Sequence, residues 1–306
     1  MSRSAAPAAT TPGPSHDAQV RAYWRALGLP GIVDVHVHFM PDRVMRKVWA
    51  YFDSAGPLTG RNWPIRYRWS DEDRLEHLRS MGVRAFPCLI YPHKPGMAEW
   101  LNDWARPFAR AHPDVVPTAT FFPEPGVTAY VEHALTQGAA IFKVHVQVGG
   151  FDPSDPLLDD VWGMLSDARV PVVVHAGSGP TPGAHTGPGP FGAVLSRHPD
   201  LTAVIAHMGM PEYDEFIGFA ETYANVHVDT TMCFVDSFDA DQSAQLRRLL
   251  APRLAALQAK VLFGADFPNI PHEYAHQIDV LTRLELGDDW MRDVMWHNGA
   301  RLLRLE

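Results

Sequence analysis

Cysteine and long apolar runs are scarce in this chain of 306 residues. The two cysteines, Cys88 and Cys233, lie far apart, and each sits in an apolar, strand-like run. This spacing argues against a disulfide framework and favours buried, reduced thiols in a cytoplasmic protein. No apolar run approaches the roughly 18 residues of a membrane-spanning helix, so we expect no membrane partner.

Basic residues are also few relative to acidic ones. Lys and Arg total 26 against 35 Asp and Glu, which leaves a net charge of −9 with neutral histidines. Because binding to a phosphate backbone needs a basic face, we expect no nucleic-acid partner. Residues 1–15 hold one Arg and no apolar stretch, which is unlike a secretory signal and predicts a disordered tail.

The rest of the chain, residues 16–306, alternates short β-branched runs with stretches of helical length. Strands are predicted near residues 31–39, 83–90, 115–122, 139–146, 170–176, 201–207, 225–230 and 260–266, and helices near 17–28, 71–81, 96–111, 127–137 and 272–305. Eight strands with intervening helices predict a single-domain α/β fold, the (β/α)8 or TIM-like barrel, with a loop region inserted after the first strand. The alternative, an open doubly wound sheet, lacks the glycine-rich G-x-G-x-x-G motif after its first strand.

Histidine is unusually frequent, with 16 residues, and several histidines end predicted strands. The polar residues at strand ends are His36, His38, Lys143, His145, His175, His207 and Asp266. A parallel barrel builds its active site at these ends, and residues two apart on a strand share a side. We therefore expect imidazoles and a carboxylate to converge on one divalent metal ion with a position open for water. The alternative is that each is a hydrogen-bonded packing residue, but their recurrence at five strand ends favours the metal site.

At these residues the chain resembles the amidohydrolase superfamily, in particular the amidohydrolase-2 branch with its aminocarboxymuconate-semialdehyde decarboxylase-like enzymes. The shared motifs are DVHVHFMP (34–41), FKVHVQ (142–147), VVVHAG (172–177), IAHMG (205–209), LFGADFPN (262–269) and HNGARLL (297–303). The resemblance implies a distorted barrel and one bound metal, usually Zn²⁺, although Fe or Mn suit the same ligands. It also implies a homodimer.

The same resemblance assigns roles to individual residues. It implies that His36, His38 and His175 bind the metal and that Asp266 completes the site as ligand, as proton acceptor, or as both. His207 is similar to the catalytic histidine of the family, which hydrogen-bonds the metal-bound water. A zinc-bound water with a lowered pKa, a carboxylate and an imidazole suit acid–base chemistry at neutral pH.

Lys143 and His145 face the same predicted cavity from one strand. In binuclear members of the superfamily a carboxylated lysine at this strand bridges two metals. In the amidohydrolase-2 branch a single metal is the norm, so we assign Lys143 to electrostatic support of the site and keep the bridge as an alternative. A further alternative is a buried cation paired with Asp34 or Asp266. His145 is a candidate for contact with the substrate or support of the metal ligands.

Two reactions of a small organic substrate fit this set. In a hydrolase, a metal-bound hydroxide attacks a lactone, ester or amide carbonyl. In a non-oxidative decarboxylase, the metal orients an unsaturated or aromatic carboxylic acid, and a cation holds the carboxylate. The family's arginine after the His207 position is missing, and the segment carries Glu212, Asp214, Glu215 and Glu221 instead. We therefore favour the hydrolase, with the decarboxylase second and a non-catalytic binding barrel third.

The loop after the first strand carries residues that could complete the pocket. Its arginines could supply the missing cation and its aromatic residues could form a wall or lid, or they could build a small separate core. These residues are Arg61, Arg66 and Arg68 and Trp63, Tyr67 and Trp69. Trp63 and Arg66 are the candidates we single out for contact with the substrate.

Overall fold

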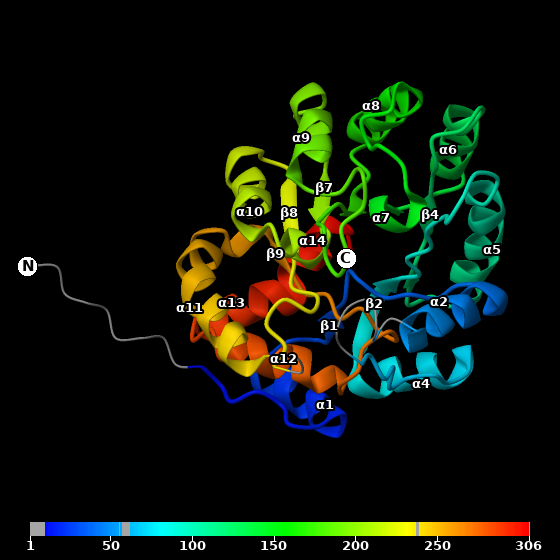
Figure 1. Cartoon of the computed structure of the whole chain (residues 1–306). Coiled ribbons are helices and arrows are strands. Elements are labelled where there is room, and N and C mark those ends of the chain that lie inside the picture. The colour runs from blue at the N-terminus through cyan, green and yellow to red at the C-terminus, as the bar shows by residue number, and fades with distance from the viewer. Residues whose placement is uncertain (1–9, 55, 57–61, 237–238, 306) are drawn as a thin grey trace, which may run out of the picture.

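A computed structural model describes residues 10–54, 56, 62–236 and 239–305, and the structural statements below refer to these residues. Short parallel strands lie in the middle and helices surround them (Figure 1). The strands are β1 (Ile32–Val33), β2 (Val83–Pro87), β3 (Val115–Val116), β4 (Thr118–Thr120), β5 (Ile141–His145), β6 (Val172–His175), β7 (Ala203–Ile205), β8 (Val226–Asp229) and β9 (Val261–Leu262).

Helices follow the strands in the order expected of βα units. They are α1 (Asp17–Ala26), α2 (Asp42–Ser54), α4 (Asp71–Met81), α5 (Ala98–Ala111), α6 (Val127–Thr136), α7 (Val146–Gly149), α8 (Asp159–Ala168), α9 (Pro188–Arg197), α10 (Tyr213–Thr222), α11 (Ala240–Ala256), α12 (Tyr274–Thr282), α13 (Asp288–Arg292) and α14 (Asn298–Leu302). Among the described helices, none combines the length and the apolar character needed to cross a membrane.

Two parallel sheets, β1–β2–β3 and β4 to β9, make up the barrel wall. Only Pro117 separates β3 from β4, so residues 115–120 run from one sheet into the other. Backbone hydrogen bonds join the other edges: Val35 N–H donates to Phe263 O at 2.9 Å, and His38 N–H donates to Phe267 O at 2.8 Å. The eight predicted strands are therefore all present, and the prediction of a (β/α)8 barrel is confirmed.

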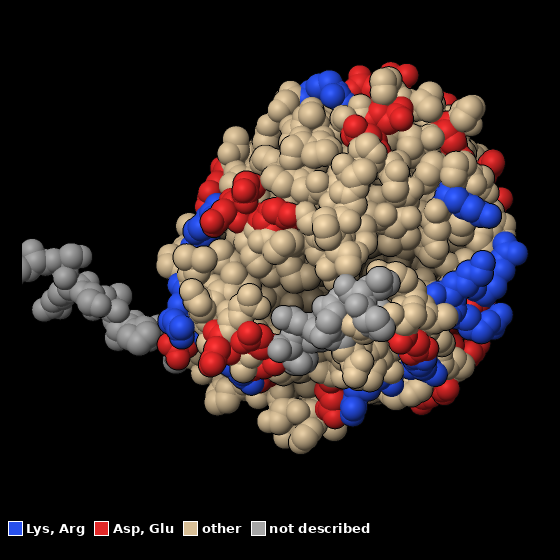
Figure 2. Space-filling model, viewed as in Figure 1, with Lys and Arg blue, Asp and Glu red and all other residues tan. Residues whose placement is uncertain are grey.

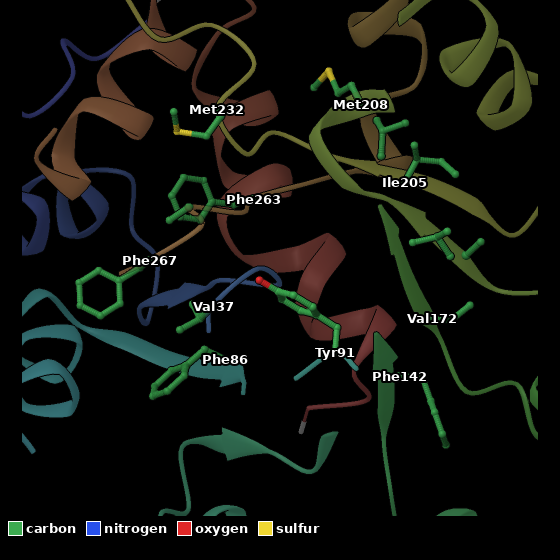
Figure 3. Packing of buried hydrophobic residues seen from close by; sticks show 14 of the residues in the cluster. Val37, Phe86, Tyr91, Phe142, Val172, Ile205, Met208, Met232, Phe263 and Phe267 are labelled. Atoms are coloured by element: carbon green, nitrogen blue, oxygen red, sulfur yellow. The ribbon is translucent and has the colours of Figure 1, made fainter. Parts of the chain in front are cut away.

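Side chains alternate between two apolar layers along β5 and β6. Ile141 and Val173 belong to the cluster inside the barrel, whereas Phe142 and Val172 pack between the strands and the helices (Figure 3). Strand residues two apart share a side, so Lys143 and His145 continue the inner row of β5, and His175 continues that of β6. The polar residues thus form the upper layer of an otherwise apolar interior.

Helix α4 shows how local sequence sets these elements. The Ser70 side chain accepts a hydrogen bond from Asp73 N–H and begins the helix, with acidic residues in its first turn. The helix ends at Gly82, whose φ of 88° is a left-handed conformation that glycine adopts without strain. Both ends agree with the range of 71–81 predicted from the sequence.

Part of the predicted disordered tail is ordered against the barrel. Residues 1–9 lie outside the described residues. From Thr10 onward the chain is described, and Thr11 donates to the Asp288 carboxylate through its N–H at 2.7 Å and its hydroxyl at 2.8 Å. Residues 10–15 therefore depart from our expectation, because these contacts with α13 tie down a segment whose composition alone is typical of disorder.

Candidate active site

Three candidate metal ligands meet where the first and last strands close the barrel. His38 Nε2 lies 3.0 Å from Asp266 Oδ1, and His36 Nε2 lies 3.8 Å from the same oxygen. Asp266 N–H also donates to His36 O at 2.8 Å, so the backbone sets this spacing. One ligand atom from each of the three residues lies within 4.8 Å of the others, a grouping that could hold a metal ion.

The Nδ1 atoms of both imidazoles are engaged in hydrogen bonds with other protein groups. His36 Nδ1 lies 2.8 Å from Asp229 Oδ2, and His38 Nδ1 lies 2.7 Å from Leu89 O. Because the carboxylate and the carbonyl can only accept, each Nδ1 carries the proton, and a neutral ring then has its lone pair on Nε2. At 3.0 Å the His38 lone pair faces a carboxylate oxygen, so a proton or a cation is required between them. Imidazoles held this way through Nδ1 are typical of metal ligands, and the residues fit a bound divalent ion.

His175 enters the same cavity but not this group of three. Its Nε2 lies 3.0 Å from Gly179 O and donates to it, which leaves Nδ1 as the atom able to bind a metal. Its ring stacks on His145 at a centroid distance of 3.9 Å and lies 4.6 Å from the His207 ring. The structure therefore places His175 beside the site, and its role as a ligand remains a prediction.

His207 and Asp266 hold left-handed backbone conformations that non-glycine residues rarely adopt. Their φ angles are 55° and 64°. The strain at His207 is held in place by two hydrogen bonds: its N–H donates to Asp229 Oδ1 at 2.8 Å, and its Nδ1 donates to Thr231 O at 3.1 Å. Strain of this kind concentrates at functional sites. Because Nδ1 binds Thr231 O, His207 Nε2 has no hydrogen-bond partner among the described residues and is available within the cavity that His207 lines.

Asp229, which the sequence analysis did not select, joins the metal group to His207. It is fully buried at the end of β8 and accepts from His36 through one oxygen and from His207 through the other. The signal that would have found it is the one used for its neighbours, a polar residue ending a strand. Burial raises the pKa of Asp229, and the charge of His207 opposes that rise.

Burial also acts on the other ionisable groups of the site. It lowers the pKa of His36 and His175 well below the usual histidine value, which favours the neutral rings that bind metals. Burial alone would raise the pKa of Asp266, but the hydrogen bond and charge of His38 lower it to about 2. Asp266 is therefore a carboxylate at neutral pH.

Lys143 is fully buried and lines the cavity, and its Nζ has no hydrogen-bond partner among the described residues. Burial lowers its pKa to about 8, against the attraction of Asp229 and Asp266. The predicted alternative of a hydrogen-bonded pair with Asp34 is not found. Asp34 accepts from the hydroxyl of Tyr274 at 2.8 Å and from backbone N–H groups of His36 and Ala265 instead.

The loop candidates separate into two groups. Trp63 lines the cavity, and its Nε1 donates to Asn269 O at 2.7 Å. Arg66 does not line it, because its guanidinium extends to Glu273 with an Nη2–Oε1 distance of 2.7 Å. Arg68 pairs with Asp53 in the same way, and Arg61 lies outside the described residues. The expected contact of Arg66 with the substrate is thus not supported by the structure.

The cavity above the three ligands has a volume of about 390 Å³. Its lining residues are His36, His38, Lys47, Val48, Tyr51, Phe52, Trp63, Tyr91, His93, Lys143, His145, Gln147, Val148, His175, Pro180, His207, Met210, Met232, Asp266 and Asn269. The imidazoles and Asp266 are at strand ends, whereas α2 and the following loop supply an aromatic wall. Within this described lining Asp266 is the only carboxylate, and Lys47 and Lys143 are the only Lys or Arg residues. Most Lys and Arg side chains of this face lie near its outline, and tan residues cover most of the described surface between them (Figure 2).

Comparisons with known proteins agree with this architecture. The chain is similar to an uncharacterised TIM-barrel protein from Bordetella bronchiseptica, with a TM-score of 0.71, 20% identity, and coverage of 90% of this chain and 98% of that one. It is similar to 5-carboxyvanillate decarboxylase from Novosphingobium aromaticivorans, solved with manganese and 4-hydroxy-3-methoxy-5-nitrobenzoic acid, with a TM-score of 0.63, 13% identity, and coverage of 90% and 96%. A protein described as a 2-pyrone-4,6-dicarboxylic acid hydrolase from Acinetobacter baumannii gives a TM-score of 0.58, 13% identity, and coverage of 90% and 100%.

At these identities the solved structures establish the fold alone. The comparison with curated proteins gave no match. The sequence profile of the amidohydrolase family matches residues 33–305, a span that begins at the second residue of β1 and holds β2 to β9 and all the candidate ligands. Members of its amidohydrolase-2 branch are metal-dependent enzymes and include hydrolases and decarboxylases. The chain therefore belongs to the amidohydrolase family.

Proposed function

We propose that this protein is a metal-dependent hydrolase that opens a lactone, ester or amide of a small organic substrate. The observation that carries the proposal is the orientation of His36 and His38, whose Nε2 atoms face Asp266 at the floor of the cavity. His36, His38 and Asp266 would hold the ion, with His175 beside them. When bound, a divalent metal lowers the pKa of a coordinated water and polarises a carbonyl.

Asp266 and His207 supply the acid–base chemistry in this proposal. Asp266, a carboxylate at neutral pH, takes the proton of the attacking water as the new C–O bond forms. It then returns that proton to the leaving oxygen or nitrogen as the old bond breaks. His207, whose ring centroid lies 5.0 Å from that of His36, donates through Nδ1 to Thr231 O, so its neutral ring accepts a hydrogen bond from the attacking water through Nε2.

The walls of the cavity suit a substrate with an apolar or aromatic body. Phe52 and Trp63 pack together at a centroid distance of 5.5 Å on one side, and Met210 and Met232 line the cavity as well. Flat aromatic faces and flexible thioethers adapt to a ring of modest size. Zinc is our choice of metal because imidazole and carboxylate ligands suit it, and manganese and iron suit them too.

A decarboxylase is the second candidate, and one observation favours it. None of the four acidic residues after His207 lines the cavity, and three of them have partners elsewhere: Glu212 binds Ser178, and Asp214 and Glu221 pair with Arg253. They would not repel a substrate carboxylate, and Lys47 or Lys143 could attract one. The hydrolase stays first because no arginine of the described residues reaches the cavity.

The first experiment is elemental analysis of protein purified without added metal or chelator. About one transition ion per chain is expected, and about two would instead indicate a second metal at a carboxylated Lys143. The zinc-loaded protein is then assayed with dihydrocoumarin, an aromatic lactone, for acid release and with substituted benzoates for CO₂ release. Acid release that disappears in Asp266→Ala supports the hydrolase. CO₂ release alone supports the decarboxylase, and a protein that binds no metal contradicts both.

A further inference from the structure

Tyr91, which follows β2, carries a hydroxyl that the preceding mechanism does not use. Its side chain is 7% exposed and lines the cavity, so its small exposed surface faces the substrate space. Three imidazoles surround its ring: His38 meets it edge-on at 5.6 Å, His93 stacks on it at 5.3 Å, and His145 lies at 5.1 Å. The position of the ring is therefore set by packing on several sides.

The Tyr91 hydroxyl has no hydrogen-bond partner among the described residues, although the ring is held tightly. Other buried tyrosines nearby are satisfied: Tyr67 donates to Asp17 at 2.6 Å, and Tyr274 donates to Asp34 at 2.8 Å. Unlike a fully buried hydroxyl, that of Tyr91 opens on the cavity that the residue lines, where a ligand oxygen can meet it. Figure 3 shows the hydroxyl pointing away from Phe142, toward the middle of the cut-open barrel.

We propose that Tyr91 is a further catalytic residue, whose hydroxyl donates a hydrogen bond to the substrate oxygen held beside His38. The proposal rests on the proposed function, since the oxygen it meets is the one that gains negative charge when water adds to the carbonyl. A donor fixed in place before the reaction stabilises such an oxygen without having to reorganise. His38 links the two sites directly, because its ring contacts Tyr91 and its Nε2 faces Asp266.

The chain offers a matched control for this hydroxyl. Tyr23 in α1 likewise has a hydroxyl without a hydrogen-bond partner among the described residues, but this hydroxyl is fully buried and Tyr23 does not line the cavity. Removing the oxygen by Tyr23→Phe or Tyr91→Phe deletes no protein–protein hydrogen bond, so neither change should lower the melting temperature. If both tyrosines had only structural roles, Tyr91→Phe and Tyr23→Phe would bind ligands with the same affinity.

The test measures binding of benzohydroxamate, an oxygen-rich metal chelator with an aromatic ring, to zinc-loaded protein by calorimetry. We expect the Kd to rise by about 10-fold or more in Tyr91→Phe and to stay unchanged in Tyr23→Phe, with equal zinc content. Where dihydrocoumarin is hydrolysed, kcat should fall by about 10²-fold in Tyr91→Phe, with a smaller change in KM.

Equal Kd values for Tyr91→Phe and the wild type would overturn the proposal. So would a zinc-loaded wild type that does not bind benzohydroxamate, because the hydroxyl would then have no ligand oxygen to meet. The measurement of benzohydroxamate binding tests the role of Tyr91 independently of the proposed hydrolase function. A protein that fails to hydrolyse lactones but loses benzohydroxamate affinity in Tyr91→Phe contradicts the hydrolase and keeps the Tyr91 donor.

Discussion

His36 and Asp229 are 193 positions apart in the chain and are joined by a hydrogen bond of 2.8 Å between Nδ1 and Oδ2. The second oxygen of Asp229 accepts the backbone N–H of His207 at 2.8 Å. One buried carboxylate thus orients a candidate metal ligand and places the candidate catalytic histidine. These hydrogen bonds to Asp229 connect His36 to His207 more directly than the packing of the two imidazole rings does.

Replacing this carboxylate should weaken metal binding. In Asp229→Asn an NH₂ group, which can only donate, replaces one of the two carboxylate oxygens. The side chain can then no longer accept from both the Nδ1–H of His36 and the backbone N–H of His207. We expect zinc affinity to fall by about 10- to 100-fold, which a competition titration with a chromophoric chelator measures. The control is Glu221→Gln, which changes a carboxylate paired with Arg253 on the outer surface. Equal zinc affinities for Asp229→Asn and the wild type would remove Asp229 from the site.

Replacing His207 should separate metal binding from turnover. His207→Asn keeps a polar side chain but removes the imidazole that meets the reacting oxygen. We expect unchanged zinc content and a fall in kcat of about 10² to 10⁴. Metal analysis and steady-state kinetics on the same preparation give both values. A variant with the wild-type kcat would show that His207 takes no part in the reaction.

Acid should destabilise the protein in part through His227, a residue of β8 outside the metal group. Burial lowers the pKa of His227 from 6.5 to about 4, with further lowering by the charges of Lys260 and Arg301. Between these two values the unfolded chain binds a proton that the folded chain does not. The His227 contribution to stability is therefore present above pH 6.5 and is lost as the pH falls toward 4.

The corresponding experiment is urea unfolding at about pH 7 and about pH 5, where the free energy of unfolding should fall less in His227→Gln than in the wild type. The remaining fall belongs to other buried histidines, including His272, whose pKa burial also lowers to about 4. An identical fall in the variant and the wild type would contradict the role given to His227.

Helix α1 lies outside the span matched by the family, yet its Asp17 binds three segments within that span. Asp17 accepts from the Tyr67 hydroxyl at 2.6 Å, from His77 Nε2 at 2.8 Å and from Ala275 N–H at 2.9 Å. In Figure 1, α1 and α12 lie next to each other, and contacts between them agree. The carboxylate therefore ties the inserted loop, α4 and α12 together.

Removing it should destabilise the fold. We expect Asp17→Ala to lower the free energy of unfolding by about 2 to 4 kcal/mol, because three donors lose one charged acceptor. Urea unfolding measures the change. Asp42→Ala is the control, since its ion pair with Arg46 is exposed and should contribute little. Equal effects of the two substitutions would show that Asp17 is no more than a surface charge.

Several features of this protein could be predicted from its sequence because they depend on neighbours in the chain. The runs that form β5 and β6 are apolar and β-branched, and their two-residue period places Lys143, His145 and His175 on one face. Ser70 and Gly82 mark both ends of α4. The strand count, the barrel and the convergence of His36, His38 and Asp266 follow from such local patterns, together with the rule that parallel strands end on one side.

Other features were decided only by tertiary structure, because they join residues that are remote in the chain. No local pattern predicts that Arg66 extends to Glu273 and so does not line the cavity. Nor does one predict that Thr11 binds Asp288 and orders the end of the tail. Asp229 and Tyr91 gain their significance from partners, or from the lack of one, in the folded barrel. Periodicity shows which face of a strand a side chain occupies. Hydrogen bonds and burial depend on what the rest of the chain places opposite that face.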